Sequence, residues 1–86
     1  MDKPLSLNPR VRFRKIADNG VLVHMDDGRV IVVNEVGHAI CEMLEKPVSR
    51  GDIVDSLTTL FDVEAEQAEA DVSAFIEQME AENALA

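Results

Sequence analysis

The chain has 86 residues and a formal net charge of −9, with 47% hydrophobic and 29% charged residues. A chain of this length buries only about 60–65% of the surface that its unfolded form exposes. We therefore expect a single domain over residues 1–86, with a modest core and no large enclosed active site. The composition is typical of a folded globular domain and excludes a disordered tail.

The start of the chain argues against export and against a membrane anchor. No apolar run approaches the ~18 residues of a membrane span, and residues 1–10 lack the hydrophobic centre of a signal peptide. The single cysteine, Cys41, excludes an internal disulfide and fits a reducing compartment. We expect a cytoplasmic protein that does not bind membranes, with residues 1–9 as a flexible arm.

Positive charge is concentrated at the start of the chain. Five of the eight cations lie within the first fifteen residues, whereas residues 16–86 carry three cations against sixteen of the seventeen carboxylates. A surface this acidic repels a phosphate backbone. We therefore expect no nucleic-acid partner, and a winged-helix DNA-binding protein stays only as a lesser alternative.

Three strands are predicted first along the chain. Over residues 11–16 cations alternate with apolar residues, which is the period of a half-buried strand. Asn19-Gly20 precedes an apolar run over residues 21–25, and Asp27-Gly28 precedes four β-branched residues at 30–33. Both dipeptides tolerate the positive φ that tight hairpin turns require. We expect an antiparallel meander of three strands.

Three helices are predicted next. Asn34 is a suitable N-cap for a helix that closes near Pro47, and Ser49 with Asp52 forms a capping-box arrangement ahead of a short second helix. From about residue 64, apolar side chains follow one helical stripe, made of Ala65, Ala68, Val72, Phe75, Ile76 and Met79. Strands followed by helices predict an α+β fold.

The two edge strands of this meander are protected differently. The first has Pro9 and several cations beside it, which discourage pairing with another chain. The third has only Arg29 at its start. Because side chains alternate across a sheet, either Ile31 and Val33 or Val30 and Val32 face the core, and the sequence leaves both choices open.

An open third edge predicts a groove in which an extended peptide adds as a fourth strand beside the last helix. Four or five backbone hydrogen bonds at roughly 1 kcal/mol each do not reach the ~8 kcal/mol of micromolar binding. Apolar contacts must supply the rest. The alternatives are a strand covered by the protein's own helices, or an edge joined in a homodimer.

A longer pattern then narrows the choice. Asn34 ends a strand, Ala39, Ile40 and Leu44 follow it, and the chain continues with Ile53, Leu57, "FDV" at 61–63 and "DVSAFIEQM" at 71–79. Over residues 10–86 this spacing resembles the PqqD family, the small peptide chaperones of pyrroloquinoline quinone synthesis. The family includes the related recognition elements of ribosomally made, modified peptides (RiPPs).

The resemblance implies a winged-helix-like fold, with a three-stranded antiparallel sheet followed by three helices. It also implies that the leader of a precursor peptide adds antiparallel to the third strand and is presented to a modifying enzyme, such as a radical-SAM enzyme or a leader peptidase. On this chain the expected peptide-binding residues belong to the third strand and the last helix. They are Arg29, Val30, Ile31, Val32, Val33 and Asn34, with Ala68, Asp71, Val72 and Phe75.

Neither catalysis nor a cofactor or metal is expected. His38 and Cys41 are three residues apart on the first helix, but a closed zinc site needs four ligands, and the sequence has no Cys-x-x-Cys. A nucleophilic Cys41 would lack an orienting third group. We expect a non-catalytic peptide chaperone, monomeric or homodimeric. The alternative is an adaptor or homodimerisation module without peptide specificity.

Overall fold

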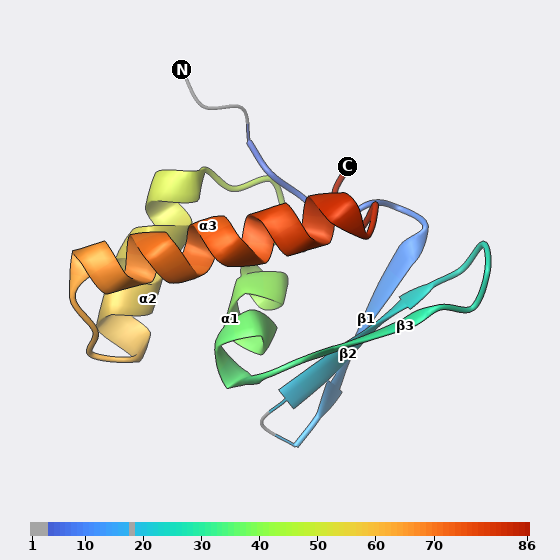
Figure 1. Ribbon diagram of the computed structural model, residues 1–86, viewed down its shortest axis with the longest axis horizontal. Coiled ribbons are helices and arrows are strands. Elements are labelled where there is room, and N and C mark those ends of the chain that lie inside the picture. The colour runs from blue at the N-terminus through green and yellow to red at the C-terminus, as the bar shows by residue number, and fades with distance from the viewer. Residues whose placement is uncertain (1–3, 18) are drawn as a thin grey trace.

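The computed structural model describes residues 4–17 and 19–86. Within them, three strands precede three helices: β1 (Val11–Ile16), β2 (Asn19–His24), β3 (Val30–Val33), α1 (Glu35–Met43), α2 (Arg50–Leu60) and α3 (Ala65–Ala81). The strands form one antiparallel sheet in the order β1-β2-β3. The predicted α+β fold is confirmed, and the winged-helix-like description is compatible with it (Figure 1).

The helices cover one face of the sheet and leave the other face exposed. Ile31 and Val33 point to the covered face and are only 7% and 5% exposed, whereas Val30 and Val32 are 56% and 72% exposed. The choice that alternation left open is thereby decided. Ile31 and Val33 pack with buried residues of β1, β2, α1 and the C-terminal part of the chain.

The first hairpin differs from the prediction. Asn19 and Gly20 begin β2 instead of forming the turn, and Ala17 takes the positive φ, at 54°. Gly20 is required for another reason, because a Cβ there would lie 2.5 Å from the ring of Phe13. Asp18, beside Ala17, lies outside the described residues.

The second hairpin turns at Asp27-Gly28, as predicted. Gly28 has a φ of 74°, a conformation that costs glycine little. The Asp27 carboxylate accepts the Arg29 amide at 2.9 Å. This hydrogen bond lowers the pKa of Asp27 from its ordinary value.

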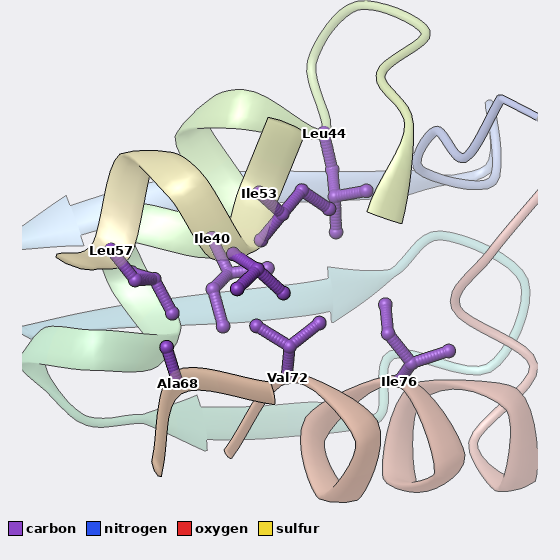
Figure 2. Packing of buried hydrophobic residues seen from close by; sticks show 8 residues of the cluster. Ile40, Leu44, Ile53, Leu57, Ala68, Val72 and Ile76 are labelled. Atoms are coloured by element: carbon purple, nitrogen blue, oxygen red, sulfur yellow. The ribbon is translucent and has the colours of Figure 1, made fainter. Parts of the chain in front are cut away.

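The predicted helix caps are confirmed. Asn34 Oδ1 accepts the Gly37 amide at 2.9 Å, and Ser49 Oγ accepts the Asp52 amide at 3.1 Å. The three helices enclose the larger part of the core, which Figure 2 shows between α1, α2 and α3. Its labelled members are Ile40, Leu44, Ile53, Leu57, Ala68, Val72 and Ile76.

The segment ahead of β1 is tied to the domain. Leu5 exchanges backbone hydrogen bonds with Val48 at 2.7 and 2.9 Å, and the Leu7 amide donates to the Leu44 carbonyl at 3.0 Å. Both leucines pack against the core of the helices. Residues 5–8 of the arm expected over residues 1–9 thus lie against the domain, and residues 1–3 lie outside the described part of the chain.

Candidate functional site

The outer edge of β3 carries backbone groups that β2 does not use. In the hairpin, the His24 amide donates to the Arg29 carbonyl at 2.8 Å. Hydrogen-bonded positions alternate along an antiparallel pair, so the register directs the amides and carbonyls of Val30 and Val32 away from β2. Among residues 4–17 and 19–86, no strand pairs with this edge. Its four backbone groups are free to accept a further strand.

The outer edge of β1 is charged. The Met25 amide donates to the Arg10 carbonyl at 2.8 Å, and the same alternation directs the backbone groups of Phe13 and Lys15 outward. Exposed cations stand along the strand at Arg12, Arg14 and Lys15. A second chain that paired here would have to approach this row of charge.

Helix α3 runs in the direction opposite to β3, and the two are linked directly at one end and through α1 at the other. At the start of β3, Arg29 Nη2 donates to the Glu82 carbonyl at 2.8 Å, and the Arg29 guanidinium lies 3.3 Å from the Glu82 carboxylate. At its end, a Cβ on Gly37 would lie 2.9 Å from Val33 Cβ and 3.0 Å from the Phe75 ring. The C-terminal half of the helix, from Phe75 to Glu82, therefore lies on the side of the open strand edge.

A hollow of about 270 Å³ lies where β3 leads into α1, with α3 as its opposite wall. The buried and half-buried part of its lining is mainly apolar and includes Ile40 and Phe75. Its rim carries polar groups from Asn34, Asp71 and Gln78. An added strand whose side chains alternate would point every second side chain toward the helices and this hollow.

The structure separates the expected binding residues into two groups. Asn34, Asp71 and Phe75 line the hollow. Ala68 and Val72 do not, since both are fully buried between the three helices. They belong to the core stripe of α3, whereas the hollow is lined by the neighbouring stripe, which adds Ala74 and Gln78.

The expected strand residues also divide. Val30 and Val32 present free backbone groups, while the side chains of Ile31 and Val33 serve the core. Arg29 directs its guanidinium to Glu82, the C-cap of α3, and so joins the two walls of the groove. Its contribution is therefore to hold the helix beside the strand.

Sequence reasoning missed the other half of that junction. His24 is 4% exposed, and its Nε2 lies 2.9 Å from the Glu82 carbonyl oxygen, which also accepts from Arg29. Because side chains alternate along β2, His24 faces the buried side of the sheet with Leu22. However, no local pattern indicates that its partner lies fifty-eight residues further along the chain.

The two residues weighed for chemistry, Cys41 and His38, are both buried. Cys41 is fully buried, and burial, with Glu45 nearby, raises the pKa of its thiol to about 12. His38 stacks on Phe13 with 5.3 Å between ring centroids, and its Nε2 lies 2.7 Å from Glu42 Oε1. Within the described residues, no group of three or more His, Cys, Asp or Glu side chains is placed to hold a metal ion. Nor does that part of the chain contain a helix long and apolar enough to cross a membrane.

Comparisons with known proteins point to one family. The family model for coenzyme PQQ synthesis protein D (PqqD) matches residues 19–85. The solved structure of TbiB1 in complex with the TbiA(beta) leader peptide is 25% identical, covers 93% of both chains and superposes with a TM-score of 0.85. A lasso peptide synthetase B1 complexed with the leader peptide is 22% identical, covers 96% of this chain and 98% of its own, and has a TM-score of 0.83. No curated protein matches the chain in sequence.

Proposed function

Because this chain belongs to the PqqD family, we propose that it binds the leader of a ribosomally made precursor peptide by strand addition to β3. The bound leader is then presented to a modifying enzyme, a radical-SAM enzyme or a leader peptidase. The chain itself is a carrier and not a catalyst. Its place of action is the cytoplasm, where ribosomes release such precursors.

The observation that carries the proposal is the free, uncharged edge of β3 beside α3. Val30 and Val32 direct four backbone groups into a groove whose far wall is a helix, and the groove has a hollow at one end. This is the geometry of strand-addition sites, in which backbone bonds give affinity and pockets give specificity. The similar TbiB1 structure, which holds a leader peptide, supports the same use of the fold.

The energetics require both parts of this site. Four backbone hydrogen bonds at about 1 kcal/mol each supply roughly half of the ~8 kcal/mol that micromolar binding needs. Burial of one apolar side chain of the leader in the hollow would add about 1.5–3 kcal/mol. The proposed leader therefore has an extended segment with an apolar side chain that reaches the half-buried Phe75 in the hollow.

The proposed contacts follow from the geometry. The backbone of Val30 and Val32 pairs with the leader, and Asn34, Asp71 and Phe75 contact its side chains. Ala74 and Gln78 join this group because they line the same hollow. Ala68 and Val72 are excluded by their burial.

A carrier role also agrees with the chemistry of the side chains. The Cys41 thiol is fully buried, and its pKa is raised to about 12. A buried thiol that stays protonated is a poor nucleophile. The groups that line the hollow, two amides and one carboxylate beside apolar side chains, are suited to holding a peptide.

A titration of isotope-labelled protein with a synthetic leader peptide tests this function. The peptide is taken from a short reading frame encoded nearby. We expect amide chemical shifts to move at residues 30–34 and at residues 71, 74, 75 and 78. If several such leaders leave these amides unmoved while the protein is folded, leader binding at β3 is wrong, and a homodimerisation or adaptor module becomes the better account.

A further inference from the structure

A second concave surface lies on the opposite side of α1, between that helix and the end of α2. It consists of two adjoining hollows of about 390 and about 450 Å³ that share Met43 and Leu60. Ala39 and Phe61 complete its apolar part. Leu60 is 63% exposed, although a side chain of this type is more often buried in a folded domain.

This surface, the α1–α2 face, shares no lining residue with the hollow beside β3. Glu35, His38, Ala39, Glu42 and Met43 of α1 line it, whereas Val36, Gly37 and Ile40 of the same helix line the other hollow. Lys15, from β1, also lines the α1–α2 face, which places it toward the far edge of the sheet from β3. A peptide on β3 would leave this surface uncovered.

The charges around the α1–α2 face determine which sign of charge its partner must carry. Its rim has exposed carboxylates at Glu35, Glu42 and Asp55. Among the described residues that line it, Lys15 is the sole cation. A partner that brought its own carboxylates would be repelled, and one that brought lysine or arginine around an apolar centre would be attracted.

The backbone of the α1–α2 face selects the shape of its partner. Its two main walls are helices, whose interior amides and carbonyls bond within the helix, so these walls offer no unpaired backbone groups to an extended chain. A helical partner needs none, because its own backbone groups are already paired. From Glu35 to Met43 the face extends about 12 Å along α1, which matches roughly two turns of a partner helix.

We propose that the α1–α2 face is the docking surface for a cationic amphipathic helix of the modifying enzyme. The inference rests on the proposed function, since it assumes an enzyme that acts on the bound leader. Because α1 separates the two surfaces, leader and enzyme bind at the same time without competing. The chain thereby holds the precursor on one side of α1 and the enzyme on the other.

The test uses a synthetic amphipathic helix of leucine and lysine, about 14 residues long so that it forms at least two stable turns, and a twin in which glutamate replaces lysine. Titrated into the labelled full chain, the lysine helix should move the amides of Ala39, Met43, Leu60 and Phe61, and the glutamate twin should not. Saturation with leader should leave its affinity unchanged within about twofold, because the two surfaces share no residue.

Two substitutions at side chains of similar exposure sharpen the test. Leu60→Ser should weaken the lysine helix by about tenfold, since it removes one apolar side chain from the contact. Ile16→Ser is the control, because Ile16 is 57% exposed on β1 and lies outside this face. Equal loss in both variants, or shifts spread along the acidic surface of α3, would overturn the proposal and indicate attraction by net charge alone.

The outcomes separate this inference from the proposed function. If leader moves the amides of β3 and the lysine helix moves nothing on the α1–α2 face, only the docking surface is wrong. If the lysine helix binds as described and no leader moves β3, the docking surface is a helix-binding site, but the leader-presenting role is wrong.

Discussion

Both edges of the sheet present outward backbone groups, but only the β3 edge is open to pairing with a further strand. β1 directs the backbone groups of Phe13 and Lys15 outward through a row of exposed cations, and β3, which has no charged side chain of its own, directs those of Val30 and Val32 outward. Isolated edge strands are a hazard that proteins manage with charge. The comparison shows that β3 lacks protective charges at the edge where α3 forms the second wall of a groove.

The surroundings of the edges differ as much as their charges. Beside β1, the Val11 amide is already bonded to the Asn8 carbonyl at 2.9 Å, so the start of that edge is closed by its own chain. Beside β3, the junction of Arg29 with Glu82 links the strand to the helix at one end, and at the other end Gly37 of α1 lies close to both Val33 and Phe75. The start of the β1 edge is closed by its own chain, whereas the β3 edge stays open and has α3 on its outer side.

The largest effect is expected from proline at the centre of the open edge. Val32→Pro removes an outward amide, and its ring disturbs the neighbouring bonds of an added strand. Leader affinity should fall by about a hundredfold, or about 2.7 kcal/mol, when measured by calorimetry. Lys15→Pro removes the matching outward amide of β1 and should leave leader affinity unchanged. A folded Val32→Pro protein with normal affinity would contradict strand addition.

Adding a methyl group at Gly37, at the end of the groove, should lower the stability of the protein. Gly37→Ala places a Cβ 2.9 Å from Val33 and 3.0 Å from Phe75, so the free energy of unfolding should fall by about 1–3 kcal/mol. Gly51→Ala is the control in α2, where the nearest atom lies 4.0 Å away, and there the usual helix preference should raise stability by up to about 1 kcal/mol. Urea denaturation measures both. Equal gains would mean that the contact between β3, α1 and α3 is loose.

Substitution of two half-buried phenylalanines should distinguish the leader site from the α1–α2 face. Phe75→Ala should weaken leader binding by about tenfold, because it removes the main apolar contact in the hollow. Phe61→Ala lies on the other side of α1 and should leave leader affinity intact, although both variants lose some stability. The same titration by calorimetry compares them. A larger loss of leader affinity in Phe61→Ala than in Phe75→Ala would place the leader on the α1–α2 face and contradict binding beside β3.

The smallest effect is expected from the junction itself. Arg29→Ala removes the bonds to Glu82, but the Arg29 side chain is 43% exposed, so solvent screens the ion pair. The free energy of unfolding should fall by only about 0.5–1 kcal/mol, with leader affinity within about twofold. Arg14→Ala on β1 is the control, and thermal unfolding is the measurement. A loss of leader affinity above tenfold would assign Arg29 a direct contact with the peptide.

The order of elements and the helix starts follow from local signals. Asn34 and Ser49 cap the helices that their side chains predict, and the β-branched run at 30–33 is an edge strand whose inner pair was undecided until the helices were placed. The sequence predicts the first turn at the wrong position, because Asn19-Gly20 is a common turn dipeptide. Here Gly20 is instead required by the Phe13 ring.

The groove wall shows where periodicity stops being informative. Ala68 and Val72 lie on the apolar stripe of α3, and such a stripe marks the core before it marks a binding surface. The residues that line the hollow lie on the adjacent stripe, at Asp71, Ala74, Phe75 and Gln78, where polar and apolar residues mix. The bond from Arg29 to the Glu82 carbonyl joins positions fifty-three residues apart, and only the tertiary fold brings them together.

The most direct test of strand addition is amide hydrogen exchange, measured residue by residue with and without a saturating leader peptide. The account predicts that the Val30 and Val32 amides, which point away from β2, become protected by about a hundredfold or more as they bond to the leader. The outward amides of Phe13 and Lys15 should exchange at unchanged rates. Protection at β1, or a bound leader that leaves Val30 and Val32 exchanging freely, would contradict the central claim that β3 is the docking edge.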